Sequence, residues 1–477
     1  MLFNSLHFAV FLPVVFVLYW SLQKAGLKAQ NLLLLAASYV FYGMWDWRFA
    51  VLLLLGSFVD FQVGRMLGFE AVEKRRKLLL WISVVVNLAL LGFFKYYDFF
   101  VESFAGLLGL FGVNAGLRTL GILMPVGISY YTFKKLSYTI DVYKRRLEPT
   151  SDAGVFFAFV AFFPQILAGP IDRGTTLLPQ FLRRREFSDP LARDGLRQIL
   201  SGFMKKMVIA DNLLPMVNDL FENHGSYDGV SLVIGVFFAA MQLYFDFAGY
   251  SDIAIGVGKL LGFRLMANFR YPYFSRDIAE FWRRWHISLS SWLRDYLYVP
   301  MCGVKPSRNK RGVMIVVLFV ICGLWHGAGW TYVFWGFLHG LYFLPMTLKK
   351  RHRRYIGDAG AGRVLPSFRE FGAMLWTFAL TSFAWVFFMG DSFSQAFGVL
   401  SGIVTRPYMA LDYSAYLPLL GGCFLLMLLE WFQRGREYFL DIAHLPLVLR
   451  WGIYNVCILV ILVFGAFGST EFIYTQF

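Results

Sequence analysis

The feature that most constrains the fold of this chain is a series of long apolar runs separated by short basic clusters. Runs such as 6–22 and 78–94 carry no charged residue, and a membrane-crossing helix needs about 20 mainly apolar residues. Strands of a membrane barrel would instead alternate apolar and polar residues. The chain is 58% hydrophobic and 16% charged, against about 25% charged in soluble domains. The sequence therefore predicts an all-α polytopic membrane protein.

The apolar runs divide all 477 residues without leaving room for a soluble module. At about 20 residues per crossing, we expect about 11 transmembrane helices plus re-entrant and interfacial helices. Run 6–22 has no basic region ahead of it and no small-residue cleavage site, so we interpret it as a retained first helix. No internal repeat is visible, and the polar loops 183–197 and 349–365 are too short to fold alone. We predict a single domain over residues 1–477. The runs are 6–22, 31–47, 49–67, 78–94, 99–113, 121–143, 155–167, 199–220, 230–247, 313–325, 333–348, 371–388, 417–431 and 447–467.

The net charge of +15 gathers in clusters between these runs. Such clusters are typical of cytoplasmic loops that meet anionic lipid headgroups, so membrane lipids are expected partners. A nucleic-acid role is not expected, because no cluster belongs to a soluble module with base-stacking aromatic residues. Four cysteines without paired spacing indicate neither a zinc site nor a disulfide framework, and no metal site is predicted. The clusters lie at 74–77, 144–146, 183–185, 205–206, 308–311 and 349–354.

His326 is the only acidic, basic or imidazole side chain between Arg311 and His339. Ionisable groups in apolar segments are costly and are usually functional, and an imidazole can take and return a proton near neutral pH. A core histidine bonded to a neighbouring helix is the alternative. Because run 313–325 is too short to cross alone, we expect a helix end at Trp325–Gly327 that presents His326 to a cavity.

A second group of candidate residues lies in the aromatic-rich segment 274–299. Phe281, Trp285, Trp292 and Tyr296 recur at helical spacing, which favours an amphipathic helix pair at the membrane interface. His286 is a second imidazole in an aromatic setting. The charged residues of this segment either support a site or bind lipid headgroups; they are Arg283, Arg284, Arg294 and Asp295.

Two carboxylates and a proline complete the local predictions. Asp246 ends an uncharged run, and Asp252 follows it through an expected glycine-containing turn. Carboxylates in a membrane usually pair with a base or line a wet cavity; for Asp252 we favour a structural ion pair. Pro164 predicts a broken or re-entrant helix within 155–167. The partners that we expect for the carboxylates are Arg270, Arg283, Arg284 and His286.

Several of these segments resemble the membrane-bound O-acyltransferase (MBOAT) family, and most closely its bacterial branch that acetylates exopolysaccharides such as alginate. The family pattern Trp-Arg-Arg-Trp-His-Ile-Ser-Leu-Ser-x-Trp-Leu-Arg-Asp-Tyr-Leu-Tyr is present from Trp282 to Tyr298, and Gly-Leu-Trp-His-Gly-Ala at 323–328. One departure is 300–308, where the family often has a Gly-Gly-Asn-Arg-type turn. Segment 242–252 is a further close match, and weaker matches cover 31–42, 125–133, 137–143 and 163–170.

The resemblance implies a fold around a central cavity, with a signature core of about 121–342. It implies that His326 is required for transfer, that His286 lies near it, and that His339 occupies a further family position. A hydroxyl becomes a good nucleophile when an imidazole removes its proton, so we predict His326 as general base and His286 as its partner. Oxyanion donors stay open among protonated His286, tryptophan N–H groups and the backbone of 327–329. Supporting residues are expected to be Asp246, Arg283, Arg284, Trp325, Asp295 and His339.

The resemblance further implies an O-acetyltransferase in a bacterial cell inner (cytoplasmic) membrane. The expected substrate is acetyl-CoA or a phosphopantetheine-linked acyl donor, with no tightly bound cofactor. The expected partners are a secreted or periplasmic acetyltransferase and a polysaccharide acceptor, for which alginate, cellulose and peptidoglycan stay open. Alternatives are D-alanyl transfer to teichoic acid, a proton-coupled transporter using Asp246 and His326, and a lipid-binding scaffold without turnover.

Overall fold

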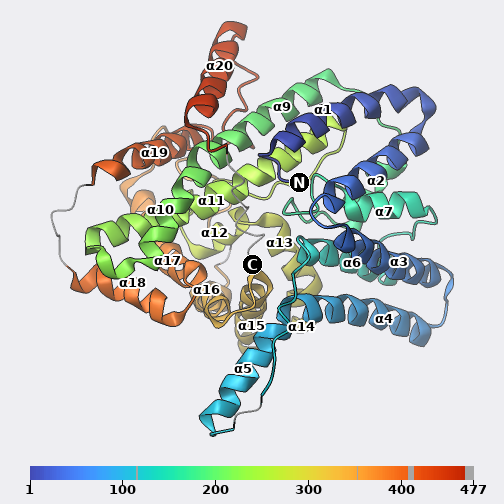
Figure 1. Ribbon diagram of the computed structural model, residues 1–477, viewed down its shortest axis with the longest axis horizontal. Helices are drawn as coiled ribbons and strands as arrows, with labels where there is room; N and C mark the ends of the chain where they lie inside the picture. The colour runs from blue at the N-terminus through green and yellow to red at the C-terminus, as the bar shows by residue number, and fades with distance from the viewer. Residues whose placement is uncertain (114–115, 352, 407–412, 468–477) are drawn as a thin grey trace. The chain divides into compact units, whose positions relative to one another are not determined.

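The structure, a computed structural model, describes residues 1–113, 116–351, 353–406 and 413–467, and within these ranges it is helical with no strand (Figure 1). The all-α prediction is therefore confirmed. The helices are α1 (Leu6–Ser21), α2 (Leu27–Gly43), α3 (Trp47–Phe69), α4 (Glu73–Leu91), α5 (Tyr97–Leu110), α6 (Ile128–Tyr143), α7 (Ala153–Ala161), α8 (Gly174–Leu182), α9 (Asp189–Phe203), α10 (Asp211–Glu222), α11 (Gly229–Leu260), α12 (Ile278–Arg284), α13 (Ile287–Leu293), α14 (Val299–Cys302), α15 (Arg308–His326), α16 (Trp330–Leu348), α17 (Phe368–Met389), α18 (Phe393–Thr405), α19 (Leu417–Phe432) and α20 (Leu447–Phe464).

Eight helical segments among the described residues are long and apolar enough to cross a membrane. The protein is accordingly a multi-pass membrane protein. About eleven crossings stays a prediction, because the other helices are shorter or less apolar by the same measure. The eight segments are Leu6–Ala25, Trp47–Phe69, Glu73–Leu110, Gly229–Leu260, Arg308–His326, Phe368–Met389, Ser414–Phe432 and Leu447–Phe464.

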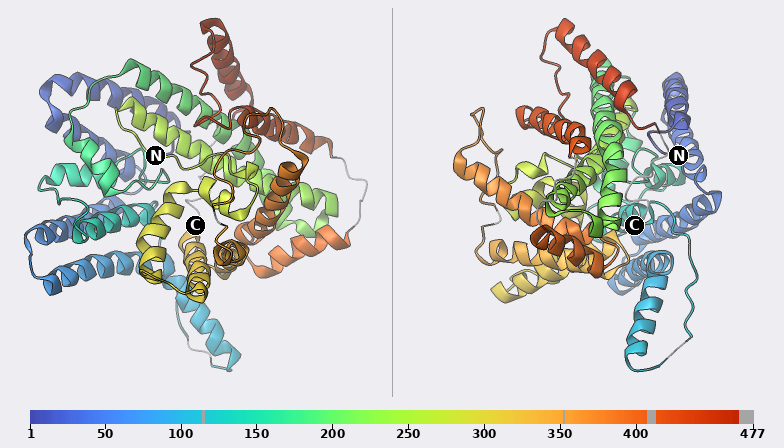
Figure 2. Two further views of the ribbon diagram at one scale, coloured as in Figure 1. Left: turned by 180° about the vertical axis from the view of Figure 1, so that it is seen from behind. Right: turned by 60° about the vertical axis from the view of Figure 1, so that its left-hand side comes forward.

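The chain forms two compact units. The first, residues 1–192 and 258–265, contains α1 to α8, and its helices α3, α4 and α6 pack side by side (Figures 1 and 2). Between them Lys135 Nζ lies 3.5 Å from the carboxylate of Asp60, which also accepts hydrogen bonds from Ser83 and Asn87. A buried charge is tolerated when it is paired and hydrogen-bonded, so this cluster joins the three helices.

The predicted helix break near Pro164 is present in the first unit. Helix α7 ends at Ala161, and residues 162–173 continue without regular secondary structure although they are mostly buried. Irregular backbone inside a membrane protein must be satisfied by protein groups. Lys134 provides one such contact, because its Nζ donates to the carbonyl of Phe159 at 2.8 Å and to Gln165 Oε1 at 3.0 Å.

The second unit, residues 193–257 and 266–477, contains most of α9 and α11 and all later helices. Its α11 spans 32 residues, so the turn predicted between Asp246 and Asp252 is wrong. Gly249 lies inside this helix because the neighbouring backbone is too close for a side chain: an added Cβ would sit 2.8 Å from the carbonyl oxygen of Gly202 and 2.9 Å from the backbone nitrogen of Lys206. Glycine here permits close helix packing and does not form a turn.

Helices α15 and α16 form a tightly packed antiparallel hairpin in this unit. Gly323 of α15 faces Gly336 of α16, and a Cβ added to either glycine would clash with a carbonyl of the opposite helix, that of Tyr332 or Phe319. Small residues let membrane helices approach this closely. The hairpin fixes the position of His326, which is the last residue of α15.

Candidate active site

The structure brings His286 and His326 together inside the second unit. His326 ends α15 and His286 precedes α13, and their ring centroids are 6.4 Å apart. Trp325 lies against both rings, at 5.9 Å from His286 and 4.9 Å from His326. All three side chains are buried. Two imidazoles from segments 40 positions apart in the chain therefore share one aromatic environment.

The surroundings of His326 are aromatic. Trp335 of α16 and Phe388 of α17 meet its ring edge to face, with centroids at 5.1 and 5.3 Å. Trp385 stacks on Trp335 at 5.4 Å and extends this wall. Apolar walls lower the local dielectric constant, which strengthens the electrostatic effect of any charge that develops beside the imidazole.

His286 is held by its backbone as well as by its side chain. Its backbone φ angle is +41°, in the left-handed region that residues other than glycine rarely adopt. Two backbone hydrogen bonds flank it: Ile287 N donates to Asn268 O at 2.8 Å, and Arg270 N donates to Arg284 O at 2.9 Å. These bonds separate α12 from α13 and turn the His286 ring toward Asn268, whose Oδ1 lies 2.9 Å from Nδ1.

His339 lies beside this pair, separated from His326 by Trp335. Its ring is 4.9 Å from Trp335, and Trp282 donates its indole N–H to His339 Nδ1 at 3.2 Å. Phe281 of α12 and Trp285, which follows this helix, are fully buried inside the unit. A helix pair that lies at the membrane interface or dips in from it stays a prediction.

The two carboxylates of α11 belong to ion clusters with lysines. Asp246 lies 2.7 Å from Lys206 Nζ, and Asp252 lies 3.0 Å from Lys205 Nζ. Both lysines are buried on a seven-residue π-helix, Met204–Ala210, that links α9 to α10. Lysines were not among the ion partners proposed from the sequence for these carboxylates. The charge pattern grouped the lysine pair with the basic loop clusters, although the pair lies inside the apolar run 199–220, and that run was the signal of its burial.

Comparison with known proteins agrees with the motifs. The family model for the membrane-bound O-acyltransferase family matches residues 150–390, and the Pseudomonas aeruginosa protein "Probable alginate O-acetylase AlgI" is 40% identical over 400 residues, covering 83% of this chain and 73% of that protein. The chain belongs to the MBOAT family. It is a membrane O-acyltransferase, as the resemblance implied. The matched region contains both histidines of the pair, His339 and α11.

Two further relatives of this MBOAT protein differ in the acyl group that, by their names, they transfer. The "Peptidoglycan O-acetyltransferase" of Helicobacter pylori is 33% identical over 433 residues, covering 85% of this chain and 80% of its own. The "Teichoic acid D-alanyltransferase" of Bacillus subtilis is 31% identical over 283 residues, covering 56% of this chain and 69% of its own.

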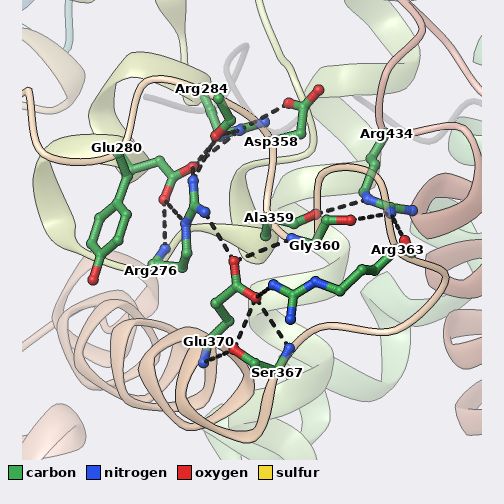
Figure 3. Close-up of polar contacts among 12 residues, drawn as sticks. Arg276, Glu280, Arg284, Asp358, Ala359, Gly360, Arg363, Ser367, Glu370 and Arg434 are labelled. Atoms are coloured by element: carbon green, nitrogen blue, oxygen red, sulfur yellow. Dashed lines mark hydrogen bonds and ion pairs between the residues drawn. The ribbon is translucent and has the colours of Figure 1, made fainter.

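Arg284, which was also predicted for the site, belongs to a separate charged network in the MBOAT chain (Figure 3). Arg284 donates to Glu280 and Asp358, each at 3.0 Å, and Arg276 bridges Glu280 and Glu370 at 3.0 and 3.2 Å. Although burial opposes the charged form, the carboxylates of Glu280 and Glu370 raise the pKa of Arg276 above its usual value. The network ties α12 to the loop after α16 and to the start of α17.

Arg283 and Asp295 also make contacts other than with the histidines. Arg283 donates to the backbone carbonyl of Tyr355, and Asp295 pairs with Arg294 at 2.6 Å. The arginines of the signature motif therefore position α12. Glu280, the partner of Arg284, and Glu370, a partner of Arg276, were missed from the sequence. The four-residue spacings of Glu280 from Arg276 and from Arg284 are nevertheless the usual signal of helical ion pairs.

The arrangement can perform proton-transfer chemistry. It offers two imidazoles close enough to act on one reacting group, indole N–H groups around them and a low-polarity wall. Among the described residues, no group of three or more His, Cys, Asp or Glu side chains is arranged to hold a metal ion.

Proposed function

We propose that this protein transfers acetyl groups from a cytoplasmic thioester donor across the membrane to a hydroxyl group of an extracytoplasmic polysaccharide or of a secreted partner protein. The observation that carries the proposal is the pair of buried imidazoles, His286 and His326, with ring centroids 6.4 Å apart. The donor is acetyl-CoA or an acyl group on phosphopantetheine. We place the protein in the inner membrane of a bacterial cell, where such donors and a secretion pathway meet.

His326 is proposed as the general base. It takes the proton of the attacking hydroxyl as the new C–O bond forms at the thioester carbonyl. The C–S bond then breaks, and the proton passes to the departing thiolate, so that a thiol leaves and the imidazole is neutral again. A general base of this kind contributes about 10²- to 10⁴-fold to the rate.

The names of the relatives favour acetyl as the transferred group. The acetyltransferase relatives align with 83% and 85% of the chain, whereas the D-alanyltransferase relative aligns with 56%. Alginate and peptidoglycan are named for different relatives, so we propose the acceptor as a glycan hydroxyl without naming the polymer. D-Alanyl transfer to teichoic acid from a carrier protein is the second candidate, supported by the shorter alignment.

The decisive experiment measures acyl transfer by purified protein in proteoliposomes that receive a radiolabelled acyl thioester on one side and a glycan on the other. His326→Ala is expected to lower the initial rate at least about 100-fold, because no base then takes the hydroxyl proton. His444→Ala is the matched control, since His444 is exposed and lies after α19.

Each outcome of this assay is interpretable. Loss of transfer in His326→Ala alone, with both variants eluting as monodisperse protein, supports the base. Near wild-type transfer by His326→Ala contradicts it. Mass spectrometry of the product identifies the group: an acetyl ester supports the leading proposal, and a D-alanyl ester replaces it by the second. Label that stays on the donor with every glycan and protein acceptor tested contradicts both.

A further inference from the structure

Asn268 is the residue through which His286 is attached to the rest of the unit. Its Oδ1 lies 2.9 Å from His286 Nδ1 and accepts hydrogen bonds from the Ser288 hydroxyl at 2.9 Å and the Ser288 backbone N–H at 3.4 Å. Its Nδ2 donates to Ser251 Oγ of α11 at 3.1 Å. The side chain is buried. One amide therefore connects α11, the strained backbone at His286 and the first turn of α13.

The orientation of this amide is fixed by its neighbours. A backbone N–H can only donate, so the amide atom that faces Ser288 N must be the oxygen. Ser251 Oγ can accept, which suits the amide nitrogen on the opposite side. The oxygen and nitrogen of Asn268 are therefore assigned by an independent donor, without reference to the histidine.

This orientation determines which nitrogen of His286 carries the proton. Oδ1 of Asn268 is an acceptor only, so His286 Nδ1 must donate to it. In the neutral imidazole the other nitrogen, Nε2, then carries the lone pair. We propose that Asn268 is a positioning residue that locks His286 as its Nδ1–H tautomer, so that Nε2 acts as a hydrogen-bond acceptor beside His326.

His339 provides a contrast within the same unit. An indole N–H donates only, and Trp282 Nε1 donates to His339 Nδ1 at 3.2 Å. The neutral His339 ring must therefore carry its proton on Nε2, the opposite tautomer. Hydrogen bonds from neighbouring residues thus hold His286 and His339 in opposite tautomers.

The tautomer decides what His286 can do. As a neutral acceptor it does not donate to a developing oxyanion; it receives a proton. The separation of 6.4 Å between ring centroids is too long for a direct hydrogen bond to His326. His286 can accept from His326 through one bridging water or hydroxyl and so stabilises the imidazolium that forms when His326 takes the hydroxyl proton. This role rests on the proposed function, whereas the tautomer does not.

One ionisable side chain in ring contact with His286 is His326 of α15. The other rings against it are Phe247 of α11 at 4.6 Å, Phe269 at 6.4 Å and Trp325 at 5.9 Å. These three rings carry no fixed charge, so a carboxylate introduced at position 268 should change the basicity of His286.

The tautomer is measured directly by ¹⁵N magnetic resonance of the full-length protein in lipid nanodiscs, with the histidine rings labelled. The His286 signals are assigned by their loss in His286→Gln. The expected spectrum at neutral pH shows a protonated Nδ1 and a bare Nε2 for His286. A protonated Nε2 with a bare Nδ1 overturns the proposal, whether or not acyl transfer is ever detected.

Kinetics separate positioning from simple structural support. Asn268→Leu should lower kcat about 10- to 100-fold with little change in KM, the range found when the hydrogen-bond partner of a metal-binding histidine is removed. Asn268→Asp keeps the acceptor, and Ser251 can rotate its hydroxyl to donate. Its added negative charge favours protonated His286, so activity should be largely retained while the acid limb of the pH–rate profile moves to higher pH.

Asn212→Leu is the matched control, because it removes a side-chain amide that donates to Phe464 O at 2.8 Å elsewhere in the same unit. It should cost stability without moving the pH profile. If Asn268→Asp and wild type share one pH profile, or if Asn212→Leu shifts the profile as Asn268→Asp does, Asn268 is structural only. If Asn268→Leu does not fold, the Asn268→Asp profile and the wild-type spectrum still decide the question.

Discussion

Lys205 and Lys206 are adjacent in sequence yet enter separate ion clusters. Lys205 lies 3.0 Å from both Asp252 and Glu430, and Lys206 lies 2.7 Å from both Asp211 and Asp246. Consecutive helical residues point in different directions, and the wider π-helix on which both lie is often found at special sites. Both lysines therefore pair with α11, and Lys205 in addition contacts α19 whereas Lys206 contacts Asp211 of α10.

We expect Lys205→Met to be among the most destabilising single changes in the second unit. It removes the cation and leaves Asp252 and Glu430 buried close together, and breaking a buried ion pair in this way costs about 3–5 kcal/mol. The measurement is the temperature at which detergent-solubilised protein loses its monodisperse elution peak.

Lys305→Met provides the comparison, because Lys305 is exposed in the turn before α15. It should leave the aggregation temperature close to that of the wild type. Equal temperatures for both variants would mean that the Lys205 cluster contributes nothing to stability.

Some residues of the candidate site could be named from the sequence and some could not. His326 and His286 are imidazoles in apolar or aromatic surroundings, which is a strong local signal. Asn268 is one of many polar residues in a loop, and its role depends on Ser251 and Ser288, which the fold brings to it. Arg283 and Arg284 carried the family motif, but their contacts with Tyr355 and Asp358 join segments that lie 72 and 74 positions apart. Pairing between distant segments leaves no local pattern.

At the scale of secondary-structure elements, the α15–α16 hairpin is the part that places His326. Glycines at four positions bring the helices together, and for Gly323 and Gly336 an added side chain would strike the opposite backbone. Backbone atoms cannot move aside as a flexible side chain can. The two helices must separate if either glycine gains a methyl group.

We therefore expect Gly336→Ala to reduce acyl transfer strongly and to lower stability by about 1–3 kcal/mol, the usual effect of overpacking. Gly372→Ala is the matched change, because no atom lies within 4 Å of the Cβ that it would add on α17. It should be neutral or slightly stabilising, since alanine favours helix over glycine. The measurements are the transfer rate and the thermal stability of both variants. An equal loss in Gly336→Ala and Gly372→Ala would contradict this expectation.

The sequence located most helices but not their ends. The apolar runs 199–220 and 230–247 mark parts of longer helical segments, because buried polar residues such as Asp252 and Lys259 continue α11 beyond the apolar pattern. Run 121–143 was too long instead: α6 begins only at Ile128, after Gly127 in the left-handed conformation. A hydropathy pattern indicates which residues face lipid. It does not show where a helix continues through polar residues that are buried by the protein itself.

At the scale of the whole molecule, the charge distribution predicts how the protein crosses the membrane. Residues 296–357 include basic but no acidic side chains, and the antiparallel hairpin places both of their basic clusters at one end. Basic loops are retained in the cytoplasm. We expect Lys305→Cys and Arg351→Cys both to react with a membrane-impermeant maleimide only from the cytoplasmic side.

The native cysteines, all four of which are buried, should give little background in this assay. Labelling of both positions from intact cells rather than from inverted vesicles would reverse the predicted orientation. Labelling of the two positions from opposite sides would show that α15 and α16 do not form a hairpin within the bilayer.

The segment between α16 and α17 has a practical consequence for anyone who modifies this protein. It has the composition of a polar linker, yet Arg434, just after α19, donates to Ala359 O at 2.8 Å and to Gly360 O at 2.9 Å (Figure 3). Arg276 also donates to Gly357 O at 2.5 Å. An affinity tag or protease site inserted at 357–360 would displace α12 and the motif that carries His286. Exposed Gly225, where an added Cβ would meet no atom within 4 Å, is the better insertion point.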